Sequence, residues 1–68
     1  MYKNLEAEMT RYEITQKDIA KCINRTEGTT NLKMNGKAKF DVNELFMIRD
    51  FIQTKTDKYL SVDYLFKK

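Results

Sequence analysis

The chain has 68 residues, a net charge of +3, no histidine and one cysteine, Cys22. This length predicts one domain over residues 1–68, and a lone cysteine excludes an internal disulfide, which suits a reducing cytoplasm. No apolar run approaches the roughly 20 residues of a membrane span, and the N-terminus lacks the apolar centre of a signal peptide. We therefore expect a cytoplasmic protein that makes no membrane contact.

The spacing of three apolar residues predicts a first helix, and a capping pattern at residue 15 predicts the start of a second. Leu5, Met9 and Tyr12 are spaced i, i+4, i+7, which places them on one helical face. Thr15 is followed three residues later by Asp18, a spacing that resembles a capping box. We expect the second helix to bury Ile19, Ala20 and Ile23.

A turn and a third helix follow. Asn24 suits a left-handed turn because asparagine tolerates positive φ better than most residues. Thr26 is the expected cap of a helix from about Glu27 to Met34. The pair Asn35-Gly36 then ends this helix, with Gly36 just beyond its last residue.

Two more helices are expected in the second half of the chain. Asp41 and Glu44 form a second capping-box pattern. Residues 53–59 are polar and predict a loop, and Ser61 caps a short last helix. The fourth helix carries Val42, Leu45, Phe46, Ile48 and Ile52, and the last carries Val62, Leu65 and Phe66. No period-2 run predicts a strand.

The positive charge is concentrated in the middle of the chain. Residues 15–40 hold six basic and two acidic side chains, a balance of +4, whereas residues 1–14 have −1 and residues 41–68 have 0. Such a distribution favours a nucleic-acid-binding surface around the second and third helices. An ordinary lysine-rich surface would give the same count.

The sequence of these two helices and the turn between them also resembles that of a known protein family. The stretch "QKDIAKCINRTEGTTNLKMNG" has the length and turn of a helix-turn-helix. Together with "DVNELFMIRDFI" and "LSVDYLF", it resembles the Cro and lambda-repressor-like (XRE) family, small phage and prophage regulators of Gram-positive bacteria in particular. The resemblance implies an all-α, compact five-helix fold with a DNA-binding helix-turn-helix.

The resemblance also implies which residues would touch DNA. Gln16 and Lys17 match positions that contact phosphate. Lys33 is interpreted as a phosphate contact or a solvated side chain. Base edges would be read by Thr26, Glu27, Gly28 and Asn31, and the backbone would be touched by Asn35, Lys37 and Lys39.

The turn and the third helix depart from the family pattern at several positions. Arg25 and Thr30 stand where apolar residues are usual, and Leu32 stands where a polar residue is common. Gly28 lowers helix propensity by roughly 1 kcal/mol relative to alanine. Three alternatives follow: a modest site read by Asn31 and threonines, weak electrostatic DNA binding, or binding to a protein through the third helix.

A partner surface is expected beyond the third helix. Met47 and Phe51 lie i, i+4 on a separate side of the fourth helix. With Tyr59 and Leu60 they would cover a homodimer or heterodimer interface. Alternatively, the fourth helix is central and the other helices wrap it. Cys22 is interpreted as a packing residue.

The sequence carries none of the patterns that support catalysis. It has no glycine-rich phosphate loop, no nucleophile beside a base and no cluster of metal ligands. We predict a non-enzymatic regulator of a lysis–lysogeny switch that binds operator DNA and needs no cofactor, metal or small-molecule substrate. The alternative is an anti-repressor that binds the cognate phage repressor protein.

Overall fold

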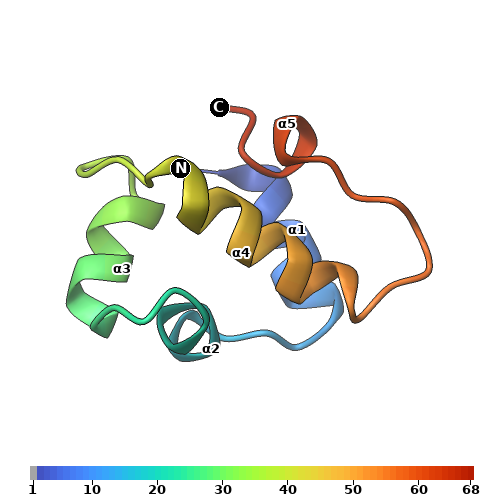
Figure 1. Cartoon of the computed structure of the whole chain (residues 1–68), viewed down its shortest axis with the longest axis horizontal. Helices are drawn as coiled ribbons and strands as arrows, with labels where there is room; N and C mark the ends of the chain where they lie inside the picture. Colours follow the sequence, from blue (N-terminus) through green and yellow to red (C-terminus); the bar gives the residue numbers. More distant parts are fainter. Residues whose placement is uncertain (1) are drawn as a thin grey trace.

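The computed structural model describes residues 2–68, which form five α-helices and no strand. The helices are α1 (Lys3–Arg11), α2 (Gln16–Cys22), α3 (Glu27–Met34), α4 (Val42–Gln53) and α5 (Val62–Leu65), as Figure 1 shows. The prediction of a small all-helical fold is therefore confirmed, with helix ends close to those expected.

The helix α4 lies at the centre of the arrangement. It contacts α2 and α5, while α3 packs against α2 and α1 packs against α5. Figure 1 places α3 at one end of the molecule and the segment between α4 and α5 at the other. The described residues extend over 30 × 21 × 20 Å. The two ends therefore present two separate surfaces.

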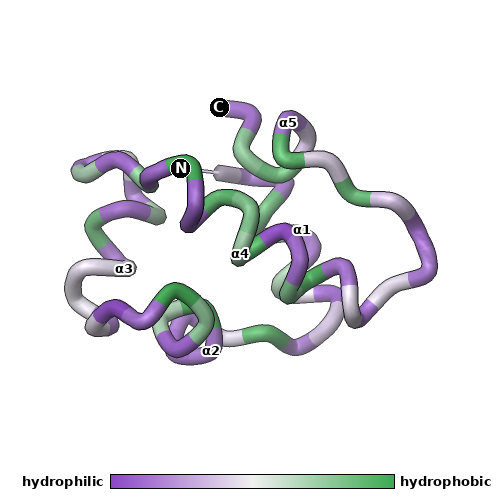
Figure 2. The backbone as a smooth tube through the Cα atoms, viewed as in Figure 1, coloured by the Kyte–Doolittle hydropathy of each residue, from purple (hydrophilic) through white to green (hydrophobic). Residues whose placement is uncertain are grey.

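The core is assembled from one face of each helix. Ile48 and Ile52 of α4 are fully buried, as their i, i+4 spacing predicts. Figure 2 shows hydrophobic stretches of α2 and α5 on the sides toward α4. The buried apolar side chains are Tyr2, Leu5, Met9, Ile14, Ile19, Ala20, Ile23, Met34, Ile48, Ile52, Leu60 and Leu65.

Two residues expected in the apolar face of the fourth helix are exposed instead. Val42 is 65% exposed and Phe46 is 53% exposed. At 100° per residue, Phe46 lies about 160° around the helix from Ile48, which sets the core-facing side. The fourth helix is therefore central, as one alternative has it, but its neighbours leave these two side chains uncovered.

The two terminal segments meet in an aromatic cluster. The ring of Tyr2 lies 5.4 Å from that of Phe66 and 5.8 Å from that of Phe40, and the rings of Phe40 and Phe66 are 5.5 Å apart. Edge-to-face contacts at these distances stabilise aromatic pairs beyond their buried area. The cluster closes the core next to the start of α4.

The loop between α4 and α5 is held by the last residue of α4. The Gln53 amide nitrogen donates to the Lys58 carbonyl at 2.5 Å, and its oxygen accepts from the Leu60 backbone N–H at 2.8 Å. Ser61 then caps α5 by accepting from the Tyr64 N–H at 3.1 Å. This loop has no regular structure, as expected, but it is fixed to the helix that precedes it.

Candidate nucleic-acid interface

The residues between and before α2 and α3 adopt the conformations that the sequence predicts. Thr15 and Asp18 form a reciprocal capping box at 2.9 and 3.1 Å. The backbone hydrogen bond from Thr15, and then its hydroxyl, lower the pKa of Asp18. Asn24 has a φ of 57°, and Thr26 caps α3 by accepting from the Thr29 N–H at 3.2 Å. Both helix starts and the turn are therefore defined by local hydrogen bonds.

The inner face of α3 is anchored by Thr30 and Met34. Thr30 is fully buried, and its hydroxyl donates to the Thr26 carbonyl one turn earlier at 2.9 Å. This bond removes the cost of burying a hydroxyl, so the methyl group packs where an apolar side chain was expected. Thr30 therefore holds α3 in place although it departs from the family pattern.

Three amide side chains form a hydrogen-bonded row across the exposed side of α2 and α3. The Asn31 nitrogen donates to the Gln16 oxygen at 3.2 Å, and the Asn35 nitrogen donates to the Asn31 oxygen at 3.1 Å. Gln16 also donates to the Glu27 carbonyl at 3.4 Å. An asparagine amide has two donors and two acceptor sites. Asn31 therefore keeps one donor and one acceptor free.

The outermost ridge of α3 is apolar and open. Leu32 is 46% exposed, and Gly28 lies one turn before it. A Cβ placed on Gly28 would meet no other group within 4 Å. Glu27 is exposed at the first position of the helix, whereas the Thr26 hydroxyl is engaged by Thr29. The ridge is thus free to approach a ligand closely.

Three of the lysines expected at the interface are exposed. Lys17 follows Gln16 in the first turn of α2, next to the amide row. Lys37 and Lys39 are exposed in the segment after α3. The Lys37 N–H donates to the Leu32 carbonyl at 2.9 Å, and Gly36 has a φ of 79°. This turn fixes Lys37 at the C-terminal end of α3.

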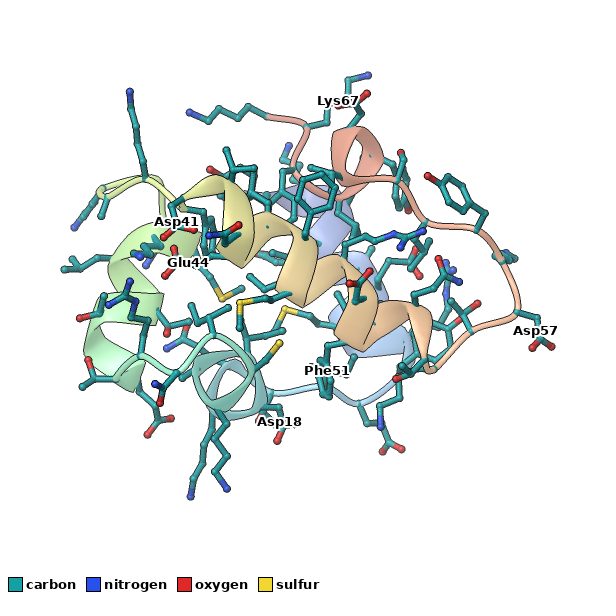
Figure 3. The ribbon with its side chains drawn as sticks, in the orientation of Figure 1. Asp18, Asp41, Glu44, Phe51, Asp57 and Lys67 are labelled. Carbon is teal, nitrogen blue, oxygen red and sulfur yellow. The ribbon has the colours of Figure 1, made fainter. Side chains whose placement is uncertain are left out.

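The structure corrects the interpretation of Lys33. Its side chain is 12% exposed, and its ammonium group lies 2.6 and 2.8 Å from the two carboxylate oxygens of Glu44. Figure 3 shows Glu44 beside Asp41 where α3 and the first turn of α4 meet. Lys33 therefore neutralises a buried carboxylate and is not available to a phosphate.

Arg25 joins the same cluster from the turn between α2 and α3. Its Nε donates to Glu44 at 2.8 Å, and Glu44 also accepts from the Asp41 backbone N–H at 3.0 Å. Burial alone would favour the neutral acid, but the hydrogen bonds from Lys33, Arg25 and Asp41 lower the pKa of Glu44 to about 2. The same bond with Glu44 raises the pKa of Arg25.

Sequence reasoning missed this cluster. Glu44 was interpreted only as the third residue of a capping box, a role that it does fulfil. The signal was Arg25 at a position where an apolar residue was expected, because a charge near the core requires a partner. The cluster connects the turn, α3 and α4, and so fixes how α3 is presented.

The four residues expected to form a partner surface do not lie together. Leu60 is 5% exposed and belongs to the core, so its assignment to the surface is wrong. Phe51 is half-buried against the core. The Met47 side chain is 41% exposed, and its backbone carbonyl accepts from the Cys22 thiol at 3.3 Å. Tyr59 is 78% exposed in the loop before α5. The predicted surface is thus divided.

Comparisons with protein-family models, with curated proteins and with solved structures find no match for this chain. Within residues 2–68, no helix has both the length and the apolar character needed to cross a bilayer. The function proposed below therefore depends on the residues of this chain and their arrangement.

Proposed function

We propose that this protein binds double-stranded DNA, with α2, the turn and α3 acting as a helix-turn-helix and α3 entering the major groove. The hydrogen-bonded row of Gln16, Asn31 and Asn35 is the observation that carries this proposal. It holds Asn31 in one orientation with a donor and an acceptor free, and that pair matches N6 and N7 of adenine.

The surroundings of Asn31 support the same orientation on DNA. Lys17 at the start of α2 and Lys37 after α3 are exposed, and such lysines can bind the phosphates that flank a helix inserted into a duplex. The exposed Leu32 side chain offers an apolar contact to a thymine methyl group. We infer a site with adenine and thymine at its centre.

The regulatory role rests on the resemblance of the helix-turn-helix stretch to phage and prophage regulators. In this proposal the protein binds an operator of a lysis–lysogeny switch and changes transcription there. The Glu44 cluster with Lys33 and Arg25 holds α3 at a fixed position, which lowers the ordering cost of binding.

A DNA titration tests the proposal. Operator-length duplexes selected from a random pool are titrated by fluorescence anisotropy, and specific sites should bind about 10³-fold more tightly than competitor DNA. Asn31→Ala should cost about 1–3 kcal/mol at one base pair of the selected site. Asn43→Ala changes an exposed asparagine of α4 outside the ridge and serves as the control. Equal affinity for selected and random duplexes would contradict specific recognition.

Phosphate contacts are tested separately by salt. Lys37→Ala should weaken binding to all duplexes alike and reduce the slope of log K against log salt by about one. Lys33→Met should leave the slope unchanged, because Lys33 is paired with Glu44. A reduced slope for Lys33→Met would reassign that lysine to DNA.

The exposed Leu32 favours a second candidate function, binding of a repressor protein through α3. Leu32 and Gly28 form a ridge of low charge, and contiguous exposed apolar surface marks protein-binding sites. In this case Leu32→Lys should abolish a complex with a cognate phage repressor, whereas selection from the random pool should yield no preferred duplex.

A further inference from the structure

The pair Asn35-Gly36 at the end of α3 differs chemically from every other asparagine position in the chain. An asparagine side-chain carbonyl can be attacked by the backbone nitrogen of the next residue, and a following glycine obstructs this attack least because it has no Cβ. Asn35 and Gly36 are both exposed to water. The other asparagines precede leucine, arginine or glutamate, whose side chains hinder the attack: Asn4, Asn24, Asn31 and Asn43. Asn35 is therefore the position best suited to deamidation.

Deamidation at this pair proceeds in two steps and needs only water. The Gly36 backbone nitrogen attacks the Asn35 Cγ, the bond from Cγ to the amide nitrogen breaks, and ammonia leaves with the proton of the Gly36 N–H. The product is a five-membered succinimide ring. Water then opens the ring at either of its carbonyl groups, which gives aspartate or isoaspartate. Both products replace a neutral amide by a carboxylate.

The folded end of α3 holds the pair in a conformation that slows ring closure. Asn35 is the C-cap of α3 with a ψ of 2°, and its N–H donates to the Asn31 carbonyl at 3.0 Å. The Gly36 N–H, which carries the attacking nitrogen, donates to the Lys33 carbonyl at 3.2 Å. Ring closure requires this nitrogen to leave that bond and rotate toward the Asn35 Cβ. The reaction therefore proceeds from molecules in which the end of α3 has opened locally.

We propose that Asn35 is a deamidation site and that its conversion lowers the affinity of the amide row for DNA. In the intact row the Asn35 nitrogen donates to the Asn31 oxygen at 3.1 Å. A carboxylate has no donor, so it repels this oxygen until the Asn31 amide turns over. The Asn31 oxygen then faces the oxygen of Gln16, which had accepted from its nitrogen at 3.2 Å. The free donor and acceptor of Asn31 exchange places and no longer match N6 and N7 of adenine.

The new charge acts in the same direction. Lys37 and Lys39 are exposed in the segment after Gly36. A carboxylate at position 35 attracts their ammonium groups and repels phosphates, which weakens contacts with the DNA backbone. One more acid lowers the balance of residues 15–40 from +4 to +3. Conversion thus causes a slow and irreversible loss of binding, a consequence that rests on the function proposed above.

The chemistry is tested without DNA. The whole chain is incubated in mildly alkaline buffer, folded or in urea, and conversion is followed by peptide mass spectrometry. In urea, Asn35 should convert about tenfold or more faster than Asn43, which precedes glutamate. Folding should slow conversion of Asn35 by about tenfold or more. Asn35→Gln keeps an amide but would have to close a larger ring, so position 35 should then remain unconverted.

The consequence for binding is tested with the aspartate product itself. On a duplex that the wild type selects, Asn35→Asp should bind about tenfold more weakly by fluorescence anisotropy. Asn43→Asp makes the same change on an exposed asparagine of α4 and should alter affinity by less than about twofold. Far-UV circular dichroism verifies that both variants remain folded.

Three results would overturn the proposal: equal conversion of Asn35 and Asn43 in urea, equal conversion of Asn35 in the folded and unfolded chain, or equal DNA affinity of Asn35→Asp and wild type. A wild type that selects no duplex would refute DNA binding and, with it, the effect on affinity. The conversion rates contain no DNA, so they still decide whether Asn35 is a deamidation site.

Discussion

The two ends of the molecule each depend on a buried glutamate that connects two helices, and the two connections differ in chemistry. Glu44 is 3% exposed and Glu8 is 2% exposed. Glu44 accepts from two cationic side chains, Lys33 and Arg25, and so links α3 and the turn to α4. Glu8 accepts from the Tyr64 hydroxyl at 2.8 Å and from Arg11 at 3.2 Å, and so links α5 to α1.

This difference implies different tolerance to change. Removal of Glu44 leaves the nearly buried Lys33 ammonium without its anion, and an uncompensated buried charge is strongly destabilising. Removal of the Tyr64 hydroxyl leaves Glu8 with Arg11, whose side chain is half-exposed and reached by water. The end that carries the proposed DNA-binding ridge is therefore held more rigidly than the end that carries α5.

The largest expected effect is that of Glu44→Gln. We expect a loss of about 3 kcal/mol in the free energy of unfolding, measured by urea denaturation. Such a loss approaches the total stability of a domain this small. The double variant Lys33→Met with Glu44→Gln should recover most of it, because it removes the unpaired cation and keeps a residue that can complete the cap. Glu27→Gln, at the exposed first position of α3, is the control.

The pH dependence of stability tests the contribution of Glu44 separately. The pKa of Glu44 lies at about 2, below its ordinary value of 4.5, so its contribution to stability is complete above pH 4.5. It is lost as the pH falls through the interval from 4.5 to about 2. The difference in unfolding free energy between wild type and Glu44→Gln should shrink across that interval. A difference that stayed constant from pH 7 to pH 2 would exclude Glu44 as the titrating group.

A substitution between α5 and α1 should change the free energy of unfolding less. Tyr64→Phe removes one hydrogen bond to the Glu8 carboxylate, and we expect a loss of about 1 kcal/mol in urea denaturation. That bond, with burial, also raises the pKa of Tyr64. DNA affinity should be unchanged in this variant and reduced in Glu44→Gln, since only the contacts of Glu44 orient α3. Tyr59→Phe, at a more exposed ring, should change neither quantity.

Local features of the fold were predictable from the sequence because their causes lie within a few residues. The cap of α4 depends on Asp41 and Glu44, and the turn after α3 on Gly36. The partners of Glu44 are different, because Lys33 and Arg25 lie 11 and 19 residues away from it. Contacts over such separations depend on how the helices pack, which the spacing of residues in one helix does not determine.

The same limit explains the surface assignments that were wrong. Leu60 lies beside a polar loop, but the hydrogen bond from its backbone to Gln53 turns that segment onto the core. Phe46 was expected in the core because it is apolar, yet the neighbouring helices cover α4 from the side of Ile48. Asn31 was singled out correctly as an exposed position, while its bond to Gln16 depends on the packing of α2 against α3. Its role in reading bases remains a prediction.

The smallest expected effect is that of Gly28→Ala, which separates the stability of α3 from its proposed binding to DNA. Gly28 lies inside the helix, and an alanine there would meet no group within 4 Å, so Gly28→Ala should raise the free energy of unfolding by about 0.5–1 kcal/mol. Gly36 is equally open but has a φ of 79°, so Gly36→Ala should lower stability by about 1 kcal/mol. The added methyl of Gly28→Ala stands on the outer ridge, where α3 would approach the floor of the groove. We therefore expect DNA affinity to fall a few-fold while stability rises, measured by anisotropy and urea denaturation on the same samples. A rise in both quantities would mean that the ridge at Gly28 stays clear of the DNA, and α3 would then have to dock through Asn31 and Asn35 alone.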